Sequence, residues 1–188
     1  MLGYAVGAFP SADLAARIAT RERHHDLHAE GSGNPGALNA AQVLGWRWGI
    51  GVLAADMGKG ALAALGGRAI GGDPGAYAGA AAAIAGHVAP PRKGMRGGKG
   101  VATSAGACLA VFPAYFPIDA AVAALSAVTS QRASSAIRIS CAAWVGASLV
   151  WWRRQLPNAW GPKPSVALPA FAAAGSLMIL ARVGWRRR

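Results

Sequence analysis

The chain has 188 residues, of which 54% are hydrophobic and 14% charged, whereas soluble domains carry about 25% charged residues. This composition excludes an intrinsically disordered chain, because disorder requires low hydrophobicity. The net charge of +12 is typical of nucleic-acid binders, but here the basic residues gather between long apolar runs instead of covering one solvated face. The sequence therefore predicts an all-α integral membrane protein with a single domain over residues 1–188, and no nucleic-acid partner.

Seven apolar segments are candidate membrane-spanning helices, since a crossing helix needs about 20 mainly apolar residues. In chain order they cover residues 2–19, 46–65, 76–90, 101–112, 118–128, 136–152 and 166–180. The fourth and fifth are short, and a count of five spans is the alternative. Their many Ala and Gly residues favour close helix packing in lipid.

The Lys and Arg residues outside these segments indicate the orientation, because cytoplasmic loops are enriched in positive charge. With seven spans, most of these residues fall on one side when the N-terminus is outside and the C-terminus is cytoplasmic; Arg153 and Arg154 do not fit this pattern. We therefore expect a multi-pass protein of the cell inner (plasma) membrane, with the loops around residues 31–39 and 91–100 in the cytoplasm.

The cysteines and histidines do not predict a metal site. Cys108 and Cys141 lie within apolar segments, where small buried side chains are the expected interpretation. The spacing of His and Cys does not match zinc ligands. We expect neither a metal nor a cofactor.

The first loop with a chemical signature reads GSGNPGALN at residues 31–39. Glycine accepts positive φ and allows backbone N–H groups to converge into an anion-binding nest. Ser32, Asn34 and Asn39 add side-chain donors. A turn-rich linker is the alternative interpretation of this loop.

The second loop precedes an apolar segment and reads GHVAPPRKGMRGGKGVAT at residues 86–103. Arg96 and Lys99 flank Gly97 and Gly98, so a phosphate there would meet two cations, free amides and a helix N-terminus. The spacing does not match a Walker A loop. Basic residues that only set the membrane orientation are the alternative.

Two further polar features interrupt the apolar segments. Asp56 and Lys59 are spaced i,i+3 inside the second segment, where they could pair on one helical face. Ionisable residues in a membrane are costly, so a functional role and a purely structural ion pair both stay open. Ser134 belongs to a polar break at residues 130–135.

Together these motifs resemble the PlsY family of bacterial acyl-phosphate:glycerol-3-phosphate acyltransferases. The resemblance rests on GSGNPGALN at 31–39, DMGKG at 56–60, GH at 86–87 and GMRGGKGVAT at 94–103, in the family's order. It implies a membrane enzyme that transfers a fatty acyl group from acyl phosphate to the sn-1 hydroxyl of glycerol 3-phosphate. The products are lysophosphatidic acid and phosphate, and the reaction belongs to phospholipid biosynthesis.

The resemblance also implies site residues, matching Ser32 and Asn34 in the first loop, Lys99 in the second and Ser134 in a third. We expect Ser32, Lys99 and His87 to be catalytic. We expect the substrate phosphates to be bound by Gly31, Gly33, Asn34, Gly36, Asn39, Arg96, Gly97, Gly98, Gly100 and Ser134. Asp56, Lys59 and Thr103 are expected to support the site. The hydroxyl proton could pass to a substrate phosphate oxygen or to His87.

Several positions depart from the family pattern. Leu38 and Gln42 stand where the family has Thr and Arg, and His28 stands where it has Arg. Where the family has an Arg-His-x-x-Asn-Ile segment, this sequence continues from Arg182 as Val-Gly-Trp. One lost charge-assisted contact costs about 1.5–3 kcal/mol. The alternative function is therefore a diverged paralogue, of low activity or inactive, that binds phosphate or anionic lipid.

Overall fold

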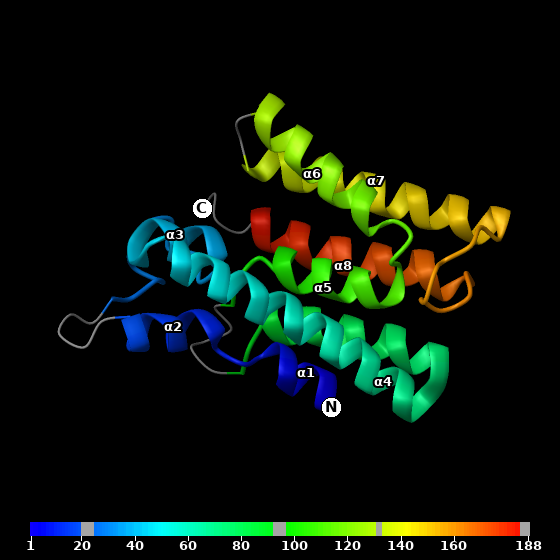
Figure 1. Cartoon of the computed structure of the whole chain (residues 1–188), viewed down its shortest axis with the longest axis horizontal. Helices are drawn as coiled ribbons and strands as arrows, with labels where there is room; N and C mark the ends of the chain where they lie inside the picture. Colours follow the sequence, from blue (N-terminus) through cyan, green and yellow to red (C-terminus); the bar gives the residue numbers. More distant parts are fainter. Residues whose placement is uncertain (20–24, 92–96, 131–132, 185–188) are drawn as a thin grey trace.

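The computed structural model describes residues 1–19, 25–91, 97–130 and 133–184, which form helices and no strand (Figure 1). In chain order the helices are α1 (Leu2–Gly7), α2 (Ser11–Ala19), α3 (Ala37–Leu44), α4 (Trp46–Val88), α5 (Val101–Val111), α6 (Phe116–Ser130), α7 (Ala133–Arg154) and α8 (Ala167–Gly184). By length and composition, α4 and α8 are able to cross a membrane. The predicted all-α fold is confirmed for the described residues.

The first predicted span, residues 2–19, is not one continuous helix, and this expectation is wrong. α1 ends at Gly7 and α2 begins at Ser11. Pro10 has no amide proton to donate, and its ring disfavours helical backbone at the preceding Phe9. The chain therefore breaks between the two short helices, and the break frees the Phe9 carbonyl for another donor.

The predicted spans 46–65 and 76–90 both belong to α4, which folds back on itself as a hairpin (Figure 1). Its first arm (46–70) and second arm (73–88) are separated by non-helical backbone at Gly71 and Gly72, and Gly72 has a φ of 61° that favours glycine. The arms approach so closely that a Cβ added to Gly67 would lie 2.1 Å from the Gly75 carbonyl oxygen. Only glycine allows this contact between the backbones.

Similar glycine contacts attach α1 and α5 to the hairpin. A Cβ on Gly7 would lie 2.0 Å from the Ala83 carbonyl oxygen, and one on Gly106 would lie 1.8 Å from that of Met57. Small residues replace large side chains at these crossings, which is the packing expected between helices in lipid. The backbones of α1, α4 and α5 therefore hold one another at close range.

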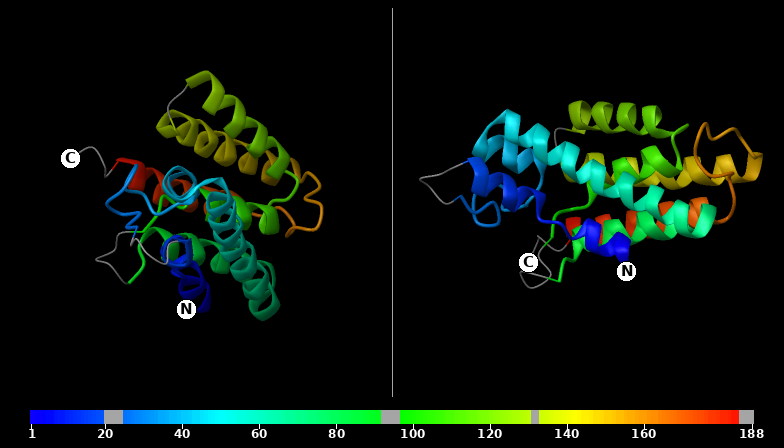
Figure 2. Two further views of the ribbon diagram at one scale, coloured as in Figure 1. Left: turned by 60° about the vertical axis from the view of Figure 1, so that its left-hand side comes forward. Right: turned by 60° about the horizontal axis from the view of Figure 1, so that its bottom comes forward.

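Helices α6 and α7 form a second hairpin, and α8 packs against both α7 and α4 (Figures 1 and 2). Aromatic rings fill the core there: the Trp144 and Phe171 ring centroids lie 5.3 Å apart. The connection after α7 lies at the same end of the molecule as the turn of α4, and Arg68 donates to the Trp160 carbonyl at 2.9 Å. The opposite end, on the left of Figure 1, carries both glycine-rich loops and the end of α8.

Candidate active site

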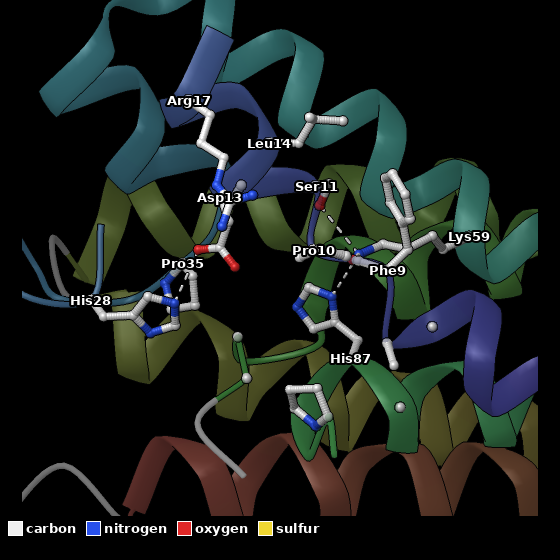
Figure 3. Close-up of a pocket in the computed structure, with 17 residues that line it drawn as sticks. Phe9, Pro10, Ser11, Asp13, Leu14, Arg17, His28, Pro35, Lys59 and His87 are labelled. Carbon is white, nitrogen blue, oxygen red and sulfur yellow. Dashed lines mark hydrogen bonds and ion pairs between the residues drawn. The ribbon is translucent and has the colours of Figure 1, made fainter. Parts of the chain in front are cut away.

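A cavity of about 230 Å³ opens at the break between α1 and α2 (Figure 3). Its wall combines segments that are distant in the sequence, including both glycine-rich loops. The lining residues are 7–14, Arg17, His28, Pro35, Lys59, Gly86, His87, Pro90, Gly97 and Gly98. The cavity is therefore the place where the predicted loops and the polar residues of α4 come together.

A buried polar network of Ser11, Asp56 and Lys59 lies beside this cavity. Asp56 and Lys59 are almost fully buried, and Lys59 Nζ lies 2.7 Å from Asp56 Oδ1. Ser11 donates its hydroxyl to Asp56, while Lys59 Nζ lies 3.2 Å from Ser11 Oγ. Lys59 also donates at 2.9 Å to the Phe9 carbonyl at the break, an oxygen that accepts from the Ser11 amide at 3.0 Å as well. The ion pair predicted from the i,i+3 spacing is confirmed.

His87, in the last turn of α4, connects the network to the cavity. Its Nδ1 lies 3.3 Å from Lys59 Nζ and 3.7 Å from Asp56 Oδ1. Its Nε2 faces the second loop, since a Cβ added to Gly98 would lie 2.3 Å from this nitrogen. The same Cβ would lie 3.1 Å from the Pro35 carbonyl oxygen in the first loop. The two loops therefore meet at His87.

The first loop is held in shape by Asn39, which is 1% exposed. Asn39 Oδ1 accepts a hydrogen bond from the Ser32 amide at 2.7 Å. Its Nδ2 donates to the carbonyls of Leu27 at 3.0 Å and Glu30 at 3.1 Å. Both polar atoms of this side chain are therefore engaged by the loop backbone, and Asn39 holds the backbone path from which a nest could form.

The remaining residues of this loop are more accessible than Asn39. Gly31 and Gly33 have positive φ of 57° and 62°, the left-handed conformation that favours glycine. Ser32 is exposed and Asn34 is half-buried. Pro35 is the residue of 31–39 that lines the cavity. The two glycines therefore have the left-handed backbone that a nest uses, while the amides of Ser32, Gly33 and Gly36 already donate to Asn39 Oδ1 and to the carbonyls of Glu30 and Asn34.

The turn before the first loop is closed by an acid–base pair. His25 Nδ1 lies 2.7 Å from Glu30 Oε2, and the Asp26 amide donates to Glu30 Oε1 at 2.8 Å. Hydrogen bonds to a carboxylate favour its charged form, so His25 and then Asp26 lower the pKa of Glu30 below its ordinary value. The pair therefore stabilises the turn above the ordinary carboxylate pKa, and this stabilisation is lost as the pH falls through the lowered one.

The second loop packs directly on the end of α4 and is tied to α8. A Cβ on Gly97 would lie 1.9 Å from the His87 carbonyl oxygen. The Gly97 carbonyl accepts hydrogen bonds from Arg182 of α8, at 2.8 Å from Nη2 and 3.3 Å from Nε. Gly100, with a φ of 85°, precedes α5 as its N-cap residue. Arg96, a predicted phosphate ligand, lies outside the described residues.

Of the predicted site residues in the described part of the chain, Lys59, His87, Gly97 and Gly98 line the cavity, and the others do not. Lys99 is half-buried beside Gly98, and Ser134 lies in the first turn of α7. Thr103 is fully buried in α5, at the crossing with α4 near Gly60. Within the described part of the chain, no group of three His, Cys, Asp or Glu residues could hold a metal ion.

Ser11, Asp13, Arg17 and Arg182 also belong to the site, although the sequence motifs did not indicate them. Asp13 and Arg17 line the cavity from α2, and Asp13 Oδ1 lies 3.2 Å from His28 Nε2. The sequence contains an indication of a site at Asp13 and Arg17, because both are charged residues in an apolar segment that Pro10 interrupts. Arg182 had a weaker signal, a lone charge near the end of the last apolar segment.

The family model described as Glycerol-3-phosphate acyltransferase matches residues 1–188, the whole chain. The chain belongs to this family. A glycerol-3-phosphate acyltransferase of Pseudomonas aeruginosa (strain PAO1) is 35% identical over 190 residues, which cover 100% of this chain and 89% of the relative. One from Thermoanaerobacter sp. (strain X514) is 31% identical over 152 residues, covering 81% of this chain and 75% of the relative.

Two solved structures of PlsY, an integral membrane glycerol 3-phosphate acyltransferase, share this fold. The glycerol 3-phosphate form has a TM-score of 0.79 and 27% identity, covering 96% of this chain and 84% of PlsY. The lysophosphatidic acid form has a TM-score of 0.77 and 26% identity, covering 96% and 83%. The resemblance to the PlsY family is confirmed, together with the predicted acyltransferase function and membrane location.

Proposed function

We propose that this chain transfers a fatty acyl group from acyl phosphate to the sn-1 hydroxyl of glycerol 3-phosphate, giving lysophosphatidic acid and phosphate. The observation that carries the proposal is the meeting of the two glycine-rich loops at His87, through Gly98 and Pro35. Both substrates carry a phosphate, so the site has to hold two anions close together. The glycine-rich loops, together with the cationic side chains near them, are the groups that we propose meet this requirement. The solved PlsY forms with glycerol 3-phosphate and lysophosphatidic acid support the proposal, because PlsY belongs to the same family as this chain.

The chemistry needs positioning more than a strong nucleophile. Acyl phosphate is already activated, so the protein mainly has to align the hydroxyl with the acyl carbon and stabilise charge on the carbonyl oxygen. The hydroxyl oxygen bonds to the acyl carbon while the bond from that carbon to the phosphate oxygen breaks. Ser32, Lys99 and His87 are the residues we assign to this step.

The substrate phosphates are assigned to the two loops and to the first turn of α7. The ligands we propose are Gly31, Gly33, Asn34, Gly36, Arg96, Gly97, Gly98, Gly100 and Ser134. Asn39 acts with them by holding the loop backbone, because its polar atoms bind Ser32, Leu27 and Glu30. Asp56, Lys59 and Thr103 support the site from α4 and α5.

Reconstituted acyl transfer tests this function. The protein in lipid nanodiscs, supplied with palmitoyl phosphate and labelled glycerol 3-phosphate, should form labelled lysophosphatidic acid, and a Lys99→Ala variant should form at least tenfold less. A wild type that forms no more product than this variant would contradict the proposal. Binding of glycerol 3-phosphate without turnover would instead identify a diverged paralogue, for which the departures at Leu38 and Gln42 are the motivation.

We also propose seven crossings, with the N-terminus outside, the C-terminus cytoplasmic and the glycine-rich loops on the cytoplasmic side of the inner membrane. The arrangement supports this, because α1 with α2, the two arms of α4, and α5 to α8 run alternately between the two ends of the molecule (Figures 1 and 2). Single cysteines at Ser32 and Lys163, in a background lacking Cys108 and Cys141, test the orientation. A membrane-impermeant thiol reagent added to intact cells should label position 163 and not position 32; the reverse pattern would refute it.

A further inference from the structure

We propose that His87 serves acyl transfer as a hydrogen-bond donor through its Nε2–H, and that Lys59 is the positioning residue that holds the imidazole in this tautomer. This inference rests on the proposed function and decides a point that the sequence leaves open. It means that His87 is not the base that removes the glycerol hydroxyl proton. Three parts of the geometry carry it.

The first part is the contact between Lys59 Nζ and His87 Nδ1, at 3.3 Å. The ammonium shares its three protons among Asp56 Oδ1, the Phe9 carbonyl, Ser11 Oγ and His87 Nδ1. Since it has no acceptor, a protonated Nδ1 would meet it proton to proton, so the lone pair of Nδ1 faces Lys59. The proton of the neutral imidazole then lies on Nε2. Asp56 Oδ1 is 3.7 Å from Nδ1, which is too far for a hydrogen bond, and it already binds Ser11 and Lys59.

The second part is how firmly Lys59 is held. Its side chain is 6% exposed, and its ammonium lies 2.7 Å from Asp56 Oδ1 and 2.9 Å from the Phe9 carbonyl oxygen. The Phe9 carbonyl is available because Pro10 ends the helical pattern. Ordering a long lysine side chain is costly when it is exposed, but here burial and an ion pair fix it beside His87. The break between α1 and α2 therefore sets the tautomer of a residue on α4.

The third part is the free side of the ring. Within the described residues, no hydrogen-bond partner is found for His87 Nε2, although the side chain is 8% exposed. The nitrogen points away from Lys59, towards the side of the cavity where Pro35 and His28 lie (Figure 3). It also faces Gly98, where a side chain would clash with the ring, since a Cβ there would lie 2.3 Å from Nε2. A donor held at the place where the two loops meet suits a ligand oxygen that bears or develops negative charge.

Nδ1 faces Lys59 with its lone pair and Nε2 carries a proton, so His87 has no lone pair available to accept the hydroxyl proton. In the reaction the glycerol hydroxyl oxygen bonds to the acyl carbon, the bond from that carbon to the phosphate oxygen breaks, and the hydroxyl proton leaves with the phosphate product. His87 keeps its Nε2 proton throughout and binds an oxygen of the substrate. Lys59 touches His87 but not the reacting atoms, so its role is positional.

Glutamine at position 87 tests the donor role, because its amide can do both tasks of the ring. Its oxygen can accept from Lys59 while its NH₂ donates where Nε2–H did. We expect His87→Gln to keep kcat within about tenfold of the wild type, and His87→Ala to lose about 10²–10³-fold, as for the removal of one oxyanion donor. Equal losses in both variants, with an activity that rises with pH only when His87 is present, would overturn the donor role.

The tautomer is measured directly, without substrate, by ¹⁵N NMR of histidine-labelled protein in nanodiscs. The His87 signal is assigned by its absence in His87→Gln. We expect a protonated Nε2 and an unprotonated Nδ1 in the wild type at pH 7, and a mixture of tautomers in Lys59→Met. A protonated Nδ1 in the wild type would overturn the inference. If the wild type shows no acyl transfer, the proposed function fails while the tautomer result stands, so the two failures are distinguishable.

Discussion

Two acid–base pairs involve residues of the first arm of α4, and they differ in how deeply their side chains are buried. Asp56 and Lys59, near its middle, pair at 2.7 Å with side chains only 2% and 6% exposed. Arg68, near the turn, pairs with Asp73 at 3.1 Å with side chains 38% and 40% exposed. Both join opposite charges a few positions apart, but Asp56 and Lys59 have the i,i+3 spacing of helical neighbours, whereas Arg68 and Asp73 pair across the break at Gly71 and Gly72.

Their surroundings give them different roles. Charges taken out of water need partners on every side, so the inner pair recruits Ser11 and the Phe9 carbonyl and fixes the conformation of His87. The outer pair keeps access to solvent, and Arg68 uses a further donor to hold the Trp160 carbonyl. The comparison teaches that burial, more than the presence of opposite charges, distinguishes a site from a surface contact.

The largest expected effect separates the two aspartates. Asp56→Asn leaves the Lys59 ammonium buried and without its counter-charge, which should cost about 3–5 kcal/mol. Asp73→Asn leaves Arg68 half-exposed and should cost about 1 kcal/mol or less. Thermal unfolding in detergent, followed by circular dichroism, should show a large fall in the midpoint for the first variant and a small one for the second. Equal shifts would remove the distinction between the pairs.

Two glycines of α4, one close to each pair, offer a matched test of the helix packing that buries the pair of Asp56 and Lys59. A Cβ on Gly60 would lie 2.0 Å from the Thr103 carbonyl oxygen, whereas one on Gly66 would meet nothing within 4 Å. Gly60→Ala should force α4 and α5 apart at a cost of about 1–3 kcal/mol. Gly66→Ala should stabilise by about 0.4–1 kcal/mol, because alanine loses less backbone entropy in a helix.

The same two glycine variants should differ in substrate affinity. α5 follows the second loop, so displacement of α5 by Gly60→Ala should also raise the KM for glycerol 3-phosphate. The KM of Gly66→Ala should match the wild type. A Gly60→Ala variant that is as stable as the wild type would show that α4 and α5 can separate freely, and the inner pair would then not depend on this crossing.

A double replacement separates stability from function at the inner pair. In Asp56→Leu/Lys59→Met both charges are gone, so no buried ion is left alone, and replacement of a whole pair is often nearly neutral. We expect the double variant to be about 2 kcal/mol more stable than Asp56→Asn. Its acyl transfer should stay low, because Nδ1 of His87 no longer accepts a hydrogen bond from Lys59. Recovery of activity together with stability would show that the pair only holds the fold.

Much of the fold could be predicted because its signals are local. Apolar runs indicated the helices α5 to α8, and the glycine-rich sequences indicated the loops at residues 31–36 and 97–100, whereas residues 37–39 of the predicted first loop begin α3. The pair of Asp56 and Lys59 followed from helical spacing. Each of these patterns is confined to a few neighbouring residues, where propensity and period are informative.

The contacts that complete the site could not be predicted in the same way, because they join distant residues. The bond from Lys59 to the Phe9 carbonyl spans 50 positions, and that from Arg182 to Gly97 spans 85. The break at Pro10 is local, but the apolar composition on both sides of it indicated one continuous span. Asn39 was predicted as a phosphate ligand, and only the fold shows its polar atoms bonded to the loop.

The smallest expected effect, salt dependence, sharpens the comparison further. Salt screens exposed charges strongly, since the Debye length falls from about 10 Å at 0.1 M to about 3 Å at 1 M, and screens buried ones much less. The difference in unfolding midpoint between wild type and Asp73→Asn should therefore shrink towards zero as KCl is raised from low to 1 M. The difference for Asp56→Asn should persist, since no ions reach side chains that are 2% and 6% exposed.

Arg68→Met serves as the control, because it removes the hydrogen bond to Trp160 as well as the pair, and part of its loss should survive high salt. Should the Asp56→Asn difference also vanish in 1 M KCl, the inner pair would be open to solvent, and Lys59 could not hold His87 in one tautomer.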